Sequence, residues 1–164
     1  MSTDMLPPAT LLIVDDDPST LLLSAKPLQE AGYFVLQAAG SSEALRLCAE
    51  RAKPVDLLLA DIFLPPPGFQ LSLNQNPYPR VNGLEMAERL LEVHPETRVI
   101  LMSSSPSSDL LSRGLIREGL PFLRKPFTGD SLLALVRQVL AGPLTPANPK
   151  KPAPSGTGDI EWFD

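Results

Sequence analysis

The sequence predicts an α/β fold in which a parallel five-stranded sheet is covered by helices on both faces. Five short apolar runs alternate with longer amphipathic segments along the 164 residues. The runs are too short for helices and are largely apolar, as expected of strands buried on both faces of a parallel sheet. Right-handed connections between parallel strands then place the intervening helices on the two faces. Apolar residues make up 43% of the chain, enough for a single hydrophobic core.

The first part of the chain contains three predicted strands and two predicted helices. The strands are expected at 11–14, 34–36 and 55–60, and the helices at 18–31 and 41–52. Asp17 and Pro18 suit the N-cap and the first position of the first helix. Pro27 lies inside this helix, where proline removes a hydrogen bond at a cost of about 3 kcal/mol, so we expect a kink or a break there. Ser41 or Ser42 is expected to cap the second helix.

The second part of the chain continues the alternation of strand and helix. Helices are expected at 84–93, 109–118 and 130–140, and strands at 99–102 and 122–123. The segment 109–118 has the weakest helical pattern because it contains Gly114, a residue that is costly inside a helix. The complete order is a strand followed by a helix, repeated five times.

Polar side chains follow four of the predicted strands. Asp15 and Asp16 follow the first strand, Asp61 the third, Ser103 the fourth and Lys125 the fifth. In a parallel sheet the carboxyl ends of the strands lie at one edge, and binding sites form there at the point where the strand order reverses. We therefore expect these five side chains to form one site.

The residue types at this edge are suited to phosphoryl transfer. Three neighbouring carboxylates repel each other and raise each other's pKa, a conflict that a divalent cation relieves. Carboxylates, carbonyls and water are the ligands that Mg²⁺ prefers, and Mn²⁺ could replace it. Asp61 could then act as a carboxylate nucleophile. Lys125 and Ser103 could pair with phosphoryl oxygens as an ammonium and a hydroxyl donor.

Five segments of the chain, in this order, resemble the receiver domains of two-component response regulators. The matching segments are 11–18, 59–65, 82–85, 99–104 and 122–127. The resemblance covers about residues 10–141 and implies a doubly wound (βα)5 flavodoxin-like three-layer sandwich. It also implies a phosphoprotein switch that receives a phosphoryl group on Asp61 from a histidine kinase or a phosphotransfer protein and acts on an unknown downstream protein.

The resemblance implies a metal-binding role for four residues. Asp16 and Asp61 would bind Mg²⁺ directly, together with the main-chain carbonyl of Phe63. Asp15 would act through a water molecule.

The resemblance also assigns residues that respond to the phosphoryl group. Lys125 would pair with the phosphoryl group, and the peptide bond between Lys125 and Pro126 would be cis. Ser103 would turn towards the phosphoryl group, and Phe122 would be the aromatic residue whose rotamer changes with the switch.

The sequence departs from the family in one loop and at its ends. We expect an N-terminal lead at 1–9, a receiver domain at 10–141 and a tail at 142–164. An inserted loop at 66–81 begins soon after Asp61, and is either a tolerated surface insertion or a lid or docking surface. The tail is Pro-rich and ends in the acidic and aromatic segment 159–164, which is either a disordered end or a docking peptide.

Charge and composition exclude several other classes of protein. The net charge is −5 and the basic residues are scattered, so no direct nucleic-acid binding is expected. No apolar run approaches the roughly 20 residues that span a bilayer, so no membrane insertion is expected. Cys48 is the only cysteine, which favours the cytoplasm.

Three functions are compatible with this sequence. The first is a stand-alone single-domain response regulator, which is not an enzyme on a separate substrate, although it could catalyse its own phosphotransfer and dephosphorylation. The family resemblance also allows a homodimer. The second is a phosphorylation-independent scaffold that binds partners through the loop at 66–81. The third is an aspartyl-phosphate hydrolase, which would need a second acid where Phe63 stands.

Overall fold

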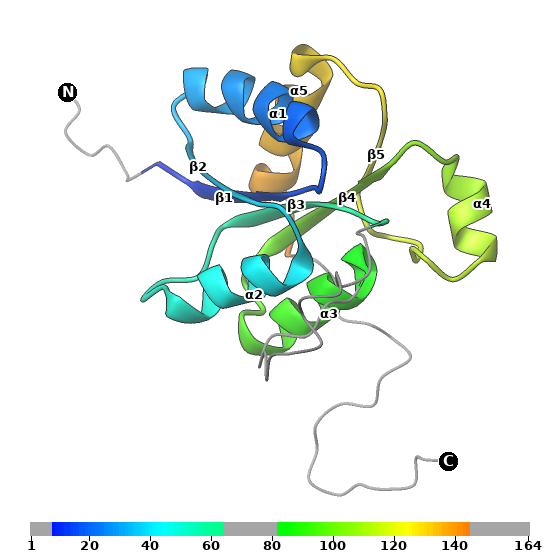
Figure 1. The fold of residues 1–164 in the computed structure, drawn as a ribbon, viewed down its shortest axis with the longest axis horizontal. Helices are drawn as coiled ribbons and strands as arrows, with labels where there is room; N and C mark the ends of the chain where they lie inside the picture. Colours follow the sequence, from blue (N-terminus) through cyan, green and yellow to red (C-terminus); the bar gives the residue numbers. More distant parts are fainter. Residues whose placement is uncertain (1–7, 64–81, 145–164) are drawn as a thin grey trace, which may run out of the picture.

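The computed structural model describes residues 8–63 and 82–144, which form five strands and five helices in strict alternation (Figure 1). The first half comprises β1 (Thr10–Val14), α1 (Pro18–Glu30), β2 (Phe34–Ala38), α2 (Ser41–Glu50) and β3 (Leu57–Asp61). The second half comprises α3 (Gly83–Val93), β4 (Arg98–Ser103), α4 (Ser107–Ser112), β5 (Phe122–Arg124) and α5 (Gly129–Ala141). All strand pairs are parallel and their order is β2-β1-β3-β4-β5. The predicted fold class is confirmed.

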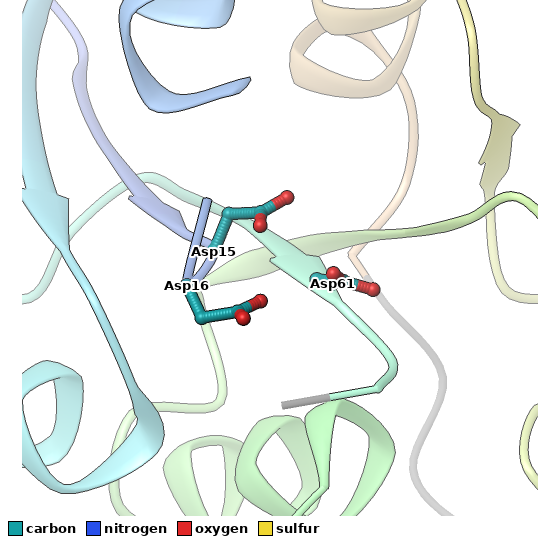
Figure 2. A group of neighbouring side chains, drawn as sticks. All are labelled: Asp15, Asp16 and Asp61. Carbon is teal, nitrogen blue, oxygen red and sulfur yellow. The ribbon is translucent and has the colours of Figure 1, made fainter. Parts of the chain in front are cut away.

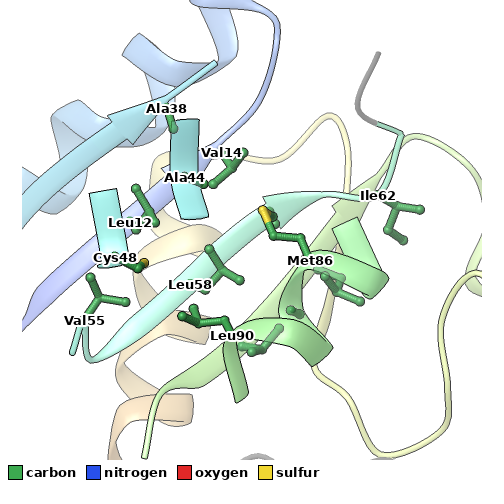
Figure 3. Close-up of a cluster of buried hydrophobic side chains, with 14 of the residues drawn as sticks. Leu12, Val14, Ala38, Ala44, Cys48, Val55, Leu58, Ile62, Met86 and Leu90 are labelled. Carbon is green, nitrogen blue, oxygen red and sulfur yellow. The ribbon is translucent and has the colours of Figure 1, made fainter. Parts of the chain in front are cut away.

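The sheet separates two hydrophobic clusters because its strands are apolar on both faces. On one face, α2 and α3 pack their buried side chains against β1, β3 and β4, as Figure 3 shows for Cys48, Met86 and Leu90. On the other face, α1 and α5 contribute Leu28 and Val136 to the second cluster. Burial raises the pKa of the Cys48 thiol to about 11, so this side chain is a neutral core residue. Figure 1 shows the resulting three layers.

The first helix begins as predicted but does not break at Pro27. Asp17 is the N-cap, its side chain accepts a hydrogen bond from the amide of Ser19, and Pro18 opens the helix. The helix continues through Pro27 to Glu30, so the predicted break is wrong, and the alternative of a kink stays a prediction. Pro27 lies in the last turns, and the carbonyl that its missing N–H would have bonded belongs to Leu23. The Leu23 side chain is 69% exposed, so water can reach this position.

Two other local predictions are also corrected. Gly40, rather than Ser41 or Ser42, is the N-cap of α2, and Glu43 reaches back to accept a hydrogen bond from the amide of Ala39. The predicted helix at 109–118 is shorter and lies earlier, at Ser107–Ser112. It ends where Gly114 adopts a φ of 73°, a left-handed conformation that glycine reaches without strain.

The strand order positions the site. β1 pairs with β2 on one side and with β3 on the other, so the chain reverses direction across the sheet at β1. The helix after β1 packs on one face and the helix after β3 on the other, which leaves the carboxyl ends of these two strands uncovered by either helix. Within residues 8–63 and 82–144, no helix has both the length and the apolar character to cross a bilayer. The predicted loop at 66–81 and most of the lead and tail lie outside the described residues.

Candidate functional site at the carboxyl ends of the strands

Three carboxylates converge at the ends of β1 and β3, as predicted (Figure 2). Asp15 and Asp16 follow β1, and Asp61 is the last residue of β3. One carboxylate oxygen from each of the three lies within 4.8 Å of the others. Asp15 is completely buried and Asp61 is 7% exposed, whereas Asp16 is exposed. Two of the three carboxylates are therefore buried, and solvent can reach the cluster at Asp16.

Lys125 bridges the two buried carboxylates. Its ammonium nitrogen Nζ donates to Oδ2 of Asp15 at 2.7 Å and to Oδ2 of Asp61 at 3.1 Å. The backbone brings it there, because the amide of Lys125 donates to the carbonyl of Ser103 at the end of the neighbouring strand β4. The Lys125–Pro126 peptide bond is cis, as expected from the resemblance. Residues from three separate strand ends thus share one charged network.

The backbone holds the other oxygen of each buried carboxylate. Oδ1 of Asp61 accepts a hydrogen bond from the amide of Phe63 at 3.1 Å, and Oδ1 of Asp15 accepts one from the amide of Asp17 at 2.9 Å. Each of these carboxylates therefore has one oxygen on a main-chain donor and one on the ammonium. This arrangement fixes the orientation of both groups.

The electrostatics of the cluster favour an added cation. Burial raises the pKa of Asp61, the ammonium of Lys125 opposes this effect, and the neighbouring carboxylate of Asp15 adds to it. Burial lowers the pKa of Lys125, but its hydrogen bonds and charge contacts with Asp15 and Asp61 outweigh burial and leave that pKa raised. Three ionised carboxylates and one ammonium carry a formal charge of −2. A divalent cation with oxygen ligands, such as Mg²⁺, matches both this charge and this donor set.

Ser103 ends β4 and Phe122 begins β5, but the side chains of these two residues do not join the hydrogen bonds between Lys125 and the carboxylates. The Ser103 side chain is buried at the end of β4, and its hydroxyl oxygen accepts a hydrogen bond from the amide of Ser105 at 3.1 Å. Phe122 is half-buried in β5 and packs against the core cluster on the α2 and α3 face. The predicted switching roles of these two residues concern a change of state and stay predictions.

Two residues that contact the site could not be assigned a role from the sequence. A Cβ atom on Gly83, the first residue of α3, would collide with the main-chain oxygen of Asp61. The guanidinium carbon of Arg113 lies 5.5 Å from the centre of the Phe63 ring. Gly83 belongs to the segment 82–85 that carries the family resemblance, and this was the sequence feature that could have indicated its importance. No sequence feature could have indicated Arg113, because its contact depends on how α4 packs.

Comparison with known proteins identifies relatives of the whole described domain. The family model described as response regulator receiver domain matches residues 11–137. The chain is 28% identical over 140 residues to the sensor kinase CckA of Brucella abortus, which covers 85% of this chain and 13% of CckA. It is 31% identical over 130 residues to the nitrogen assimilation regulatory protein NtrX of Azorhizobium caulinodans, which covers 79% of this chain and 26% of NtrX. The chain thus spans a small part of both proteins.

The solved structures agree on the fold. The structure of a response regulator receiver protein from Sinorhizobium medicae superposes with a TM-score of 0.65 at 23% identity, over 84% of this chain and 98% of that one. At this level of identity the likeness concerns the fold alone. It covers the same five-stranded architecture on which the carboxylate cluster is built.

Proposed function

Because the chain belongs to the response regulator receiver domain family, a family of phosphoaccepting signalling switches, we propose that Asp61 is its phosphoacceptor. The donor would be a histidine kinase or a phosphotransfer protein. The receiver domain would extend over residues 10–141. The observation that carries this proposal is the bridge formed by Lys125 between Asp15 and Asp61, because it sets a cation beside a buried carboxylate at the switch point of the sheet.

In the proposed reaction, a carboxylate oxygen of Asp61 attacks the phosphorus atom of the donor. A new oxygen–phosphorus bond forms on Asp61 while the bond between phosphorus and the donor breaks, and the donor leaves with the bonding electrons. The amide of Phe63 holds Oδ1 of Asp61 in orientation. Lys125 already contacts Oδ2 and can follow the negative charge onto the phosphoryl oxygens. Ser103 would donate a hydrogen bond from its hydroxyl group to another of these oxygens.

Asp16 and Asp61 would bind a Mg²⁺ ion directly, with Mn²⁺ as a substitute, and the main-chain carbonyl of Phe63 would be the third protein ligand. Asp15 would act through a water molecule. When bound, the metal would neutralise charge on the phosphoryl oxygens. The proposal is supported by the proximity of the three carboxylates and by the charge of −2 that they and Lys125 carry together.

The consequence of phosphorylation would be a changed protein-binding surface. Ser103 and Phe122 would transmit the change, since Phe122 lies on β5, the strand that Lys125 follows, and Ser103 ends the neighbouring strand β4. A receiver domain of this kind is a switch and not an enzyme for a separate substrate, although it could catalyse its own phosphotransfer and dephosphorylation. This proposal includes an unknown downstream protein that binds the changed surface. It also includes a homodimer, in the phosphorylated or the unphosphorylated state.

The test is incubation of the full chain with Mg²⁺ and acetyl phosphate, followed by intact mass measurement. We expect one phosphoryl adduct in the wild type and none in Asp61→Asn. Asp130→Asn is the matched control, because Asp130 is an exposed acid in the first turn of α5 and is not one of the three clustered carboxylates, so it should leave the adduct unchanged. A wild type without an adduct would favour the phosphorylation-independent scaffold. Rapid consumption of many equivalents of acetyl phosphate would favour the hydrolase.

A further inference from the structure

The end of α4 contacts the segment that follows β3, next to the candidate site. Arg113, the residue that follows α4, places its guanidinium group over the ring of Phe63, 5.5 Å from the ring centre. Phe63 stands two residues after Asp61 in the chain. The contact therefore connects the end of α4 to the segment that leaves the phosphoacceptor strand.

The backbone of Phe63 serves Asp61 directly. Its amide donates to Oδ1 of Asp61 at 3.1 Å, and its carbonyl is the proposed third protein ligand of the metal. Phe63 is 42% exposed and belongs to neither core cluster of the described residues. The position of this backbone segment is therefore not fixed by burial of the Phe63 side chain in the core.

Arg113 is attached to a well-anchored part of the protein. Leu110 of α4 is completely buried, and the amide of Arg113 donates to the carbonyl of Asp109 at 3.1 Å. After the helix ends, the amide of Leu115 donates to the carbonyl of Leu110 at 2.9 Å, and Ile116 returns to the core. Nη1 of Arg113 also lies 3.5 Å from a carboxylate oxygen of Asp109. The Arg113 guanidinium therefore contacts Phe63 from a helix end that is held in place by the buried Leu110 and by backbone hydrogen bonds.

We propose that Arg113 is a positioning residue that acts through the Phe63 ring to hold the Phe63 backbone in its metal-binding and Asp61-binding orientation. This inference rests on the proposed function, since it assigns a role within the same site. It makes the position of α4 and the metal affinity of the cluster depend on each other. A displacement of α4 would loosen the Phe63 segment, and a metal bound at the cluster would favour the position of α4 described above.

The sign of the effect separates positioning from simple electrostatics. Removal of a positive charge near a cation site should strengthen cation binding if charge alone matters. Loss of the contact that orders the Phe63 carbonyl should instead weaken it. An exposed cation–π contact is worth about 0.5–1 kcal/mol, which corresponds to a change of about two- to fivefold in a dissociation constant.

The experiment measures Mg²⁺ affinity by titration calorimetry on the full chain. We expect Arg113→Ala to weaken binding about two- to fivefold, and Arg113→Lys to restore part of the loss because lysine also binds aromatic faces. Arg46→Ala is the matched control, because Arg46 forms a similar pair with Glu50 on α2 at 3.4 Å and is similarly exposed. Unchanged or tighter binding in Arg113→Ala would overturn the proposal.

A second comparison tests the route through the ring. Phe63→Leu keeps the backbone and removes the ring, so Arg113→Ala should have no further effect on Mg²⁺ affinity in that background. An equal effect in both backgrounds would contradict the proposal. A metal-free readout is the exchange rate of the Phe63 amide hydrogen by NMR, which Arg113→Ala should raise. If the wild type neither binds Mg²⁺ nor forms a phosphoryl adduct, the proposed function fails; if it does both and Arg113→Ala changes neither affinity nor exchange, only this inference fails.

Discussion

Asp61 combines two properties that oppose each other in the folded protein. Its carboxylate must be ionised to attack phosphorus, yet it is nearly buried and lies near the carboxylate of Asp15. Burial therefore raises its pKa, and Lys125 compensates only in part. The hydrogen bonds from Lys125 and Phe63 hold the group in place despite this cost. A cation bound beside Asp61 would offset this cost.

This cost predicts that Asp61→Asn stabilises the metal-free protein at pH 7. The pKa of Asp61 is raised above its unfolded value of 3.8, so between those two pKa values the folded state binds more protons than the unfolded state. The free energy of unfolding then falls as the pH rises through this window. The amide removes the cost, and we expect a gain on the order of 1 kcal/mol, the usual size of a point-mutation effect. Urea unfolding at several pH values measures it.

The pH dependence distinguishes this explanation from a general loss of negative charge. The gain should shrink as the pH falls through the raised pKa and should vanish below 3.8, where the carboxyl group is neutral in both states. Asp130→Asn should show no gain at pH 7, because an acid in the first turn of α5 interacts favourably with the helix dipole. A gain of equal size at every pH would contradict the prediction.

The residues of the site could be predicted from the sequence where strand ends determine their position. Asp15, Asp61 and Lys125 each stand at the end of a strand, and parallel strands bring such ends together without any knowledge of side-chain packing. The roles of Gly83 and Arg113 could not be predicted, because they depend on contacts between segments distant in the sequence. The close approach of α3 to the Asp61 carbonyl and of α4 to Phe63 are properties of the packed protein.

At the scale of helices and strands, local propensity predicted which elements exist and was less successful with their ends. Pro27 was expected to break or kink α1; the helix is not broken there, the kink stays a prediction, and Pro27 packs near the first residue of α5. Its ring lies where a Cβ atom on Gly129 would come within 3.2 Å. Packing between α1 and α5 thus accommodates a residue that is unfavourable in an isolated helix. The prediction for α4 was wrong in its bounds because the chain turns at Gly114.

The junction between β3 and α3 predicts a specific defect for Gly83→Ala. The added Cβ atom would collide with the main-chain oxygen of Asp61, and neither partner is a flexible side chain. The strand end or the helix start must move, which should cost about 1–3 kcal/mol of stability, as overpacking usually does. The displacement should also slow phosphorylation of Asp61 by acetyl phosphate. Thermal unfolding and the time course of adduct formation measure the two effects.

Gly32→Ala provides the control for this prediction. Gly32 has a φ of 102° at the end of α1, and an added Cβ atom would find nothing within 4 Å. This variant should lose stability through backbone strain, by about 1–2 kcal/mol, without a change in the phosphorylation rate of the remaining folded protein. Equal phosphorylation rates in Gly83→Ala and the wild type would show that the close approach at Gly83 does not affect the site.

In the whole molecule, the site lies at the point of the sheet where the strand order reverses, between β1 and β3. α1 and α3 leave the neighbouring strands β1 and β3 towards opposite faces, and each face has its own hydrophobic cluster. Lys125 connects this point to β5 at the edge of the sheet. A ligand bound by the three carboxylates therefore contacts chain segments that are attached to both hydrophobic clusters. Its binding should stabilise the complete fold.

We expect Mg²⁺ to raise the free energy of unfolding of the wild type by an amount set by its affinity, about 2.7 kcal/mol at one hundred times the dissociation constant. The unfolded chain has no such cluster, because Asp15 and Asp61 are distant in the sequence. A net charge of −5 means that any salt also relieves repulsion, so the comparison requires KCl at equal ionic strength. Asp61→Asn removes a ligand and should lose most of the increase. An equal increase with KCl, or in Asp61→Asn, would indicate charge screening rather than a site.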